Sequence, residues 1–139
     1  MTKPGYSGQE AALALGPTVD NDRANAIIYM VSGRKFREPQ CGKELGAALK
    51  GATGSHRARA IGALVLVTKN SLTGEDAAAM LGSAKECGDN DRANAIIYLA
   101  GGNKFKPDLS GKELEMILDG ATGRFRAFAI DAISNASKK

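Results

Sequence analysis

Four arginines occupy equivalent places in the sequence and are its most regular polar feature. The segments DRANAI, HRARAI, DRANAI and FRAFAI share an Arg-Ala-x-Ala-Ile pattern, which places these arginines at Arg23, Arg57, Arg92 and Arg126. A guanidinium group binds phosphates and carboxylates, and it also hydrogen-bonds the free carbonyls at the C-terminal end of a helix. We expect each arginine to bridge to such carbonyls or to a nearby acid. A row of anion-binding groups along one edge is the functional alternative.

A second basic feature surrounds a phenylalanine and occurs in both halves of the chain. The segment Arg34-Lys35-Phe36-Arg37 corresponds to Asn103-Lys104-Phe105-Lys106. Electrostatic attraction to phosphate needs little sequence precision, so such a segment could contact nucleic acid. The repetition of the phenylalanine argues that it packs beneath the segment. The candidate partner-binding residues are Arg34, Lys35, Phe36, Arg37, Lys104, Phe105 and Lys106.

Two acidic clusters, Asp20-Asn21-Asp22 and Asp89-Asn90-Asp91, raise the question of calcium. An EF-hand loop needs glycine at its sixth position and glutamate at its twelfth. Counted from Asp20, these positions hold Asn25 and Val31. The pattern therefore predicts helix capping and no metal site.

The segments KGATG at Lys50 and DGATG at Asp119 suggest a phosphate-binding loop, but they lack both the spaced glycines followed by Lys-Ser/Thr and the preceding strand that such a loop needs. We predict a turn between two helices there. The chain resembles annexins in the length of its internal repeat and in this glycine-containing turn, where annexins bind the calcium that bridges to phospholipid. The turn here, Gly51-Ala52-Thr53-Gly54, departs from the Gly-x-Gly-Thr of annexins, so no function is carried over.

No catalytic constellation emerges from the sequence. His56 is the only histidine, and the second half of the chain has Phe125 in its place. The two cysteines, Cys41 and Cys87, have no metal-type spacing, so a His/Cys site of four ligands is excluded within one chain. We expect a protein that is not an enzyme and that holds no cofactor.

These residues are carried by a tandem duplication of the 139-residue chain. The segment that starts at Asn21 recurs from Asn90 at a constant offset of 69 residues, with 25 of 41 aligned positions identical. We predict a single domain, residues 1–139, built from two homologous halves of about 1–69 and 70–139.

A weaker periodicity divides each half again. The segments SGQE at Ser7, CGKE at Cys41, TGED at Thr73 and SGKE at Ser110 match the capping box that begins a helix, although a thiol accepts hydrogen bonds weakly. The first helix of each unit is expected to end at Gly16, Gly51, Gly82 and Gly120. The second helices are expected to begin near Asn21, Thr53 or Ser55, Asn90 and Thr122, all of them good N-cap residues.

The predicted fold class is all-α, with eight short helices as four antiparallel helical hairpins. Aromatic residues make up only 5% of the chain while alanines number 23, which favours short helices packed closely together. A hairpin of this size cannot bury its apolar face alone, so the units must pack on one another. We favour a compact bundle over an open solenoid.

Charge differs between the two halves. Residues 1–69 carry ten basic and five acidic side chains, a net +5, and residues 70–139 carry nine and ten, a net −1. The leading hypothesis is a non-enzymatic, cytoplasmic interaction module, scaffold or adaptor that binds a protein partner. One alternative is a nucleic-acid-binding protein that uses the basic first half. A second is a calcium- or lipid-dependent surface binder.

The expected location follows from two absences. No apolar run reaches the roughly 20 residues of a membrane span. The first five residues, Met-Thr-Lys-Pro-Gly, lack the apolar stretch of a signal peptide, so we expect a cytoplasmic chain. The sequence does not indicate an oligomeric state.

Overall fold

The computed structural model describes residues 5–137, which form eight α-helices and one short 3-10 helix. The elements in chain order are α1 (Gly8–Leu15), α2 (Asp20–Ser32), α3 (Gly42–Leu49), α4 (Gly54–Leu64), η1 (Val65–Val67), α5 (Gly74–Leu81), α6 (Asp89–Gly101), α7 (Gly111–Leu118) and α8 (Gly123–Ser137). The all-α prediction is confirmed. Residues 1–4, on which the signal-peptide expectation rests, lie outside the described residues.

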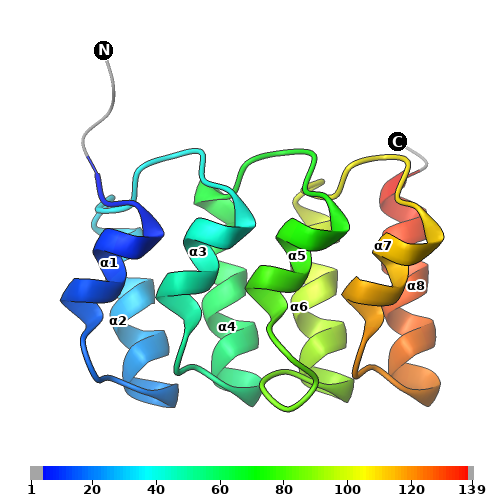
Figure 1. The fold of residues 1–139 in the computed structure, drawn as a ribbon, viewed down its shortest axis with the longest axis horizontal. Helices are drawn as coiled ribbons and strands as arrows, with labels where there is room; N and C mark the ends of the chain where they lie inside the picture. Colours follow the sequence, from blue (N-terminus) through cyan, green and yellow to red (C-terminus); the bar gives the residue numbers. More distant parts are fainter. Residues whose placement is uncertain (1–4, 138–139) are drawn as a thin grey trace.

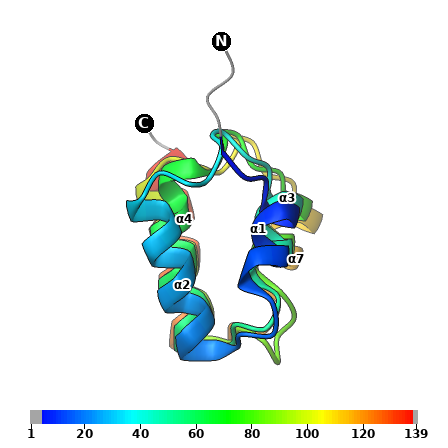
Figure 2. The same ribbon diagram turned by 90° about the vertical axis from the view of Figure 1, so that its left-hand side faces the viewer.

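Consecutive helices pair into four hairpins, α1–α2, α3–α4, α5–α6 and α7–α8, here called the first to the fourth hairpin (Figure 1). The first helices of the hairpins form one layer and the second helices form the other (Figure 2). The main helix contacts run within a layer, from α1 to α3, α5 and α7 in turn, and from α2 to α4, α6 and α8. The helices thus pack on their neighbours as in a bundle, but the hairpins stand in one row. The first and fourth hairpins are its two ends, and the row does not close on itself.

The first helices begin as their capping sequences predict. In α1, the Ser7 hydroxyl accepts a hydrogen bond from the Glu10 amide at 3.2 Å, and the Glu10 carboxylate accepts one from the Ser7 amide at 3.0 Å. The same reciprocal bonds join Thr73 with Asp76 and Ser110 with Glu113. In α3, the Glu44 carboxylate accepts from both the amide and the thiol of Cys41, each at 3.3 Å. The thiol donates there because sulfur is a weak acceptor.

The ends of the first helices differ slightly from expectation. Gly16 and Gly82 directly follow α1 and α5, and both have positive φ angles, which glycine adopts without steric cost. Lys50 separates α3 from Gly51, and Asp119 separates α7 from Gly120 in the same way.

The helices α2 and α6 begin at Asp20 and Asp89, within one residue of the expected starts at Asn21 and Asn90, but these asparagines are not the N-caps, which are Val19 and Gly88. Each of these aspartates instead caps the second helix of the next hairpin. Asp20 Oδ1 accepts hydrogen bonds from the Thr53 amide at 3.0 Å and the Thr53 hydroxyl at 2.6 Å. Asp89 makes the same two bonds with Thr122. The bonds from Thr53 lower the pKa of Asp20.

The core lies between the two layers and between successive hairpins. Its largest fully buried apolar side chains include Ile27, Leu45, Leu49, Ile61, Leu64, Leu72, Met80, Leu81, Ile96, Leu99 and Ile117. Small residues bring the hairpins close together. A Cβ at Gly42, the first residue of α3, would collide with the backbone carbonyl of Asp76 in α5. The high glycine and alanine content therefore serves close helix packing.

Candidate functional site

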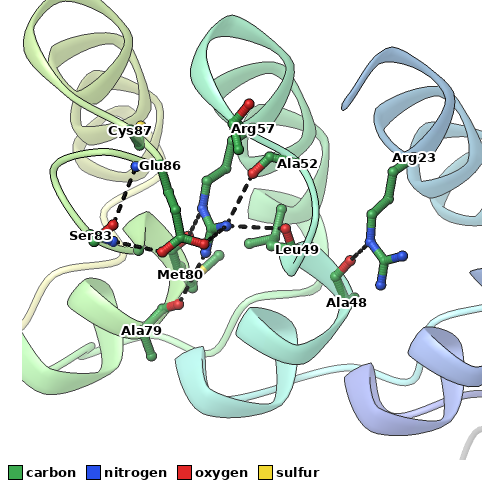
Figure 3. A network of polar contacts seen from close by, with 12 residues as sticks. Arg23, Ala48, Leu49, Ala52, Arg57, Ala79, Met80, Ser83, Glu86 and Cys87 are labelled. Atoms are coloured by element: carbon green, nitrogen blue, oxygen red, sulfur yellow. Dashed lines mark hydrogen bonds and ion pairs between the residues drawn. The ribbon is translucent and has the colours of Figure 1, made fainter. Parts of the chain in front are cut away.

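The four equivalent arginines lie in the first turns of the second helices, and Arg57 shows their role (Figure 3). Its Nε donates to the Met80 carbonyl at 2.9 Å, across the boundary with the third hairpin. One terminal nitrogen donates to the Leu49 and Ala52 carbonyls, each at 3.1 Å, within its own hairpin. Arg57 is only 3% exposed, so these bonds satisfy a buried cation.

Arg57 also has an acidic partner. Its terminal nitrogen lies 3.4 Å from a carboxylate oxygen of Glu86, in the loop between α5 and α6. The Ser83 amide and the Arg57 charge both lower the pKa of Glu86. Burial lowers the pKa of Arg57, although a guanidinium stays charged in proteins.

The other arginines repeat this geometry with one exception. Arg23 Nε donates to the Ala48 carbonyl and Arg92 Nε to the Ile117 carbonyl, each at 2.8 Å in the next hairpin. Arg126 belongs to the last hairpin, and it donates to the Leu118 and Ala121 carbonyls of that same hairpin. The expected bonds to carbonyls are thus present. The bridge to the next hairpin is an additional finding.

The second candidate set lies along what we call the linker edge, the three segments that join the hairpins: residues 33–41, 65–73 and 102–110 (Figure 1). A single parallel bridge fixes each segment to the residue that precedes a first helix. Around Phe36, the Tyr6 amide donates to the Lys35 carbonyl at 2.7 Å, and the Arg37 amide donates to the Tyr6 carbonyl at 3.0 Å. The backbone of the linker edge is therefore held in a defined path.

Phe36 and Phe105 were included among the candidate partner-binding residues, but the structure buries most of both side chains. Phe36 is 2% exposed and lies in the core, and Phe105 is partly buried against it. Phe36 therefore has little surface left for a partner, although it borders the hollow described below, whereas Phe105 keeps part of its surface. The packing interpretation of the repeated phenylalanine fits this placement.

Several basic side chains of the linker edge contact carboxylates or backbone carbonyls. Arg37 lies 3.4 Å from Glu44, and Lys106 lies 2.8 Å from Glu113. Lys69, which the sequence-based site did not include, pairs with Asp76 at 3.2 Å. Lys104 donates to the Thr68 carbonyl at 2.8 Å. Arg34 and Lys35 remain as exposed bases of the first linker.

Two hollows adjoin Arg34. One has a volume of about 520 Å³ and lies between the first linker and η1, where Val31, Arg34, Glu38 and Leu66 are among its lining residues. The other, of about 360 Å³, is lined by Gly5, Tyr6, Glu10, Arg34 and Lys35. Leu66 is 74% exposed. The surface thus combines a basic side chain, an exposed aliphatic side chain and a concave shape.

Leu66 was missed at the sequence level because it belongs to the apolar run Val-Leu-Val at the end of α4. Within this run Val67 is buried and Leu66 is exposed. Helical spacing could have identified Leu66, because a residue two positions after the buried Leu64 lies about 200° away, on the opposite side of a helix.

No protein-family model, curated protein or solved structure matches the chain. Within residues 5–137, no helix is both long enough and apolar enough to cross a membrane. Over the same described residues, no three His, Cys, Asp or Glu side chains are grouped so that they could hold a metal ion.

Proposed function

We propose that this protein is a non-enzymatic interaction module that binds a protein partner at the linker edge, in the hollow between the first linker and η1. The observation that carries the proposal is the concave surface of about 520 Å³ bordered by both Arg34 and the exposed Leu66. Exposed apolar side chains beside a hollow are typical of places where another chain docks.

The backbone of Arg34 supports a role for its side chain. Arg34 has a φ of 57°, in the left-handed region that disfavours most residues with a Cβ. The equivalent residue of the second half, Asn103, has a φ of 56°, and asparagine tolerates this region better. An arginine at such a position costs backbone energy, which fits retention of the guanidinium for binding.

The chemistry of the hollow defines the kind of partner segment. Leu66 and Val31 offer aliphatic surface, and Arg34 offers a charged fork that fits a carboxylate. Glu38 also borders the hollow, so the segment need not be acidic throughout. We expect a short segment with an aliphatic side chain next to an aspartate or glutamate.

The same edge offers less to a nucleic acid. Arg37, Lys69 and Lys106 each pair with an acid, which reduces the charge available for phosphates. The experiment described below therefore treats nucleic-acid binding as a result that would contradict the proposal. Such binding would show a steep loss of affinity with salt, whereas an apolar contact would not.

The test is affinity capture from an extract of cells that produce the protein, followed by mass spectrometry. The wild-type chain is compared with Leu66→Asp and Arg34→Glu, which alter the hollow. Lys85→Glu is the matched charge control, because Lys85 is exposed in the loop between α5 and α6, at the opposite edge. We expect a protein that wild type and Lys85→Glu retain and both hollow variants lose. Equal capture by all four chains, or capture abolished by nuclease, would contradict the proposal.

A further inference from the structure

Neighbouring hairpins meet three times in the chain, and each time the earlier hairpin contributes the same three residues: a glycine, an arginine and an isoleucine. The first is a glycine that begins each first helix. A Cβ at Gly8 would collide with the Glu44 carbonyl, one at Gly42 with the Asp76 carbonyl, and one at Gly74 would come within 2.5 Å of the Glu113 side chain. These glycines are buried by the hairpin that follows.

The other two residues lie on the second helices. An arginine Nε donates to a carbonyl of the next hairpin, as described for Arg23, Arg57 and Arg92. The isoleucine four residues later is completely buried in each of these hairpins: Ile27, Ile61 and Ile96 are all 0% exposed.

The fourth hairpin keeps all three residues although nothing in the described chain covers them. A Cβ at Gly111 would meet no atom within 4 Å. Arg126 donates to the Leu118 and Ala121 carbonyls, within its own hairpin. Ile130 is 45% exposed. We call this surface of α7 and α8, at one end of the row in Figure 1, the end face.

The first hairpin carries the complement of this surface at the other end of the row. The residues that receive the glycines, Glu44, Asp76 and Glu113, correspond to Glu10. The carbonyls that receive the arginines, those of Ala48, Met80 and Ile117, correspond to that of Ala14. The register is the same because α1, α3, α5 and α7 all have eight residues.

Apolar side chains of the first hairpin also lack the neighbour that their counterparts have. Tyr29 is 73% exposed, whereas the ring of its counterpart Tyr98 lies against Gly62 of the preceding hairpin, 3.1 Å from the place of a Cβ there. Leu13 is 84% exposed, and its counterpart Ala79 lies against Gly46 of the preceding hairpin. Both ends of the row are thus halves of one repeated interface.

We propose that copies of this chain associate head to tail, with the end face of one copy docked on the first hairpin of the next. The contact continues the interface that already joins the hairpins within a copy. A head-to-tail contact leaves a free end on each side of the pair, so the association extends beyond a dimer.

Two acids limit the strength of the contact. Glu115 and Asp131 replace Gly46 and Gly62 at positions that face the next hairpin. In the continued interface the carboxylate of Asp131 would face Tyr29 and that of Glu115 would face Leu13, so both must keep contact with water or lose hydration. The association is therefore weak and reversible, and it becomes populated at high protein concentration.

The test is sedimentation equilibrium of the purified chain at rising concentration, up to about 1 mM, the range of a weak specific contact. We expect the average mass to rise steadily past that of a dimer. Gly111→Ala should abolish this rise, because the new methyl group occupies the place where no Cβ fits in the other three hairpins. Gly101→Ala is the matched control, since that glycine also has open space around it.

The variants remain interpretable because both substituted glycines are exposed and their side-chain space is empty in the single copy. Circular dichroism of each variant checks that the fold is retained. A constant monomer mass, an association that stops at a dimer, or equal association of Gly111→Ala and wild type would each overturn the proposal.

Discussion

The Nε of Arg57 donates a 2.9 Å hydrogen bond to the carbonyl oxygen of Met80, which joins the second hairpin to the third. A terminal nitrogen of the same guanidinium bonds the Leu49 carbonyl. One buried cation thus serves the C-terminal ends of two helices, α3 and α5, whose last carbonyls have no partner within the helix. This explains why an arginine is placed in a first helical turn, where the helix dipole disfavours it.

Replacement of this arginine should be costly because its bonds reach two hairpins. Lysine keeps the charge but lacks the planar fork, so Arg57→Lys leaves buried carbonyls without donors. We expect a loss of about 3 kcal/mol in the free energy of unfolding, measured by urea denaturation. Arg126→Lys, which affects bonds within one hairpin only, should cost about 1 kcal/mol. Equal losses would contradict the bridging role.

The glycine that begins α3 should tolerate no side chain. In Gly42→Ala, the new Cβ would collide with the Asp76 backbone, so α3 and α5 must move apart. We expect a loss of about 3 kcal/mol, seen as a lower melting temperature. Gly101→Ala should leave stability unchanged or raise it slightly, because it adds helix propensity in open space. A neutral Gly42→Ala would show that the helices approach less closely.

Local signals in the sequence predicted the helices well. Ser7 and Glu10 are three residues apart, so their mutual bonds depend on nothing distant. The contacts between hairpins were not predictable in this way. Asp20 bonds Thr53, which is 33 residues away in the chain. Arg57 bonds the backbone carbonyl of Met80, and every residue type has such a carbonyl, so the sequence does not mark the acceptor.

The candidate site was predicted only in part. The basic residues of the first linker were identified, but the sequence could not decide whether Phe36 packs or binds, and the fold places it in the core. Leu66 was not identified, because it stands in the apolar run Val-Leu-Val, although its place two residues after the buried Leu64 puts it on the opposite side of a helix.

Glu113 should make stability depend on pH in the acid range. Hydrogen bonds from Lys106, and then from the Ser110 and Gly74 amides, lower its pKa from 4.5 to about 2. Because the folded pKa lies below the ordinary one, the stabilisation is fully present above about pH 4.5 and is lost as the pH falls towards 2. Glu113→Gln should therefore lose less stability than wild type over this window in urea titrations. Glu115→Gln, an exposed change on the same helix, should follow wild type. Parallel profiles for Glu113→Gln and wild type would argue against this source of pH dependence.

The two thiols should differ in reactivity. Cys87 is 0% exposed, and burial raises its pKa to about 11. Cys41 is only partly buried at the start of α3. At about pH 8, a thiol-specific reagent such as Ellman's should modify one cysteine rapidly and the second only after unfolding. Cys41→Ser should remove the rapid phase, and two rapid thiols in wild type would contradict the packing around Cys87.

The most direct test of the linker edge as a protein-binding surface is photocrosslinking from position 66. A photoreactive amino acid replaces Leu66 in one chain and Lys85 in a matched control, and both are irradiated in an extract of cells that produce the protein. The proposal predicts a discrete protein adduct from position 66 and none from position 85. The same adducts from both positions, or adducts to nucleic acid alone, would contradict it.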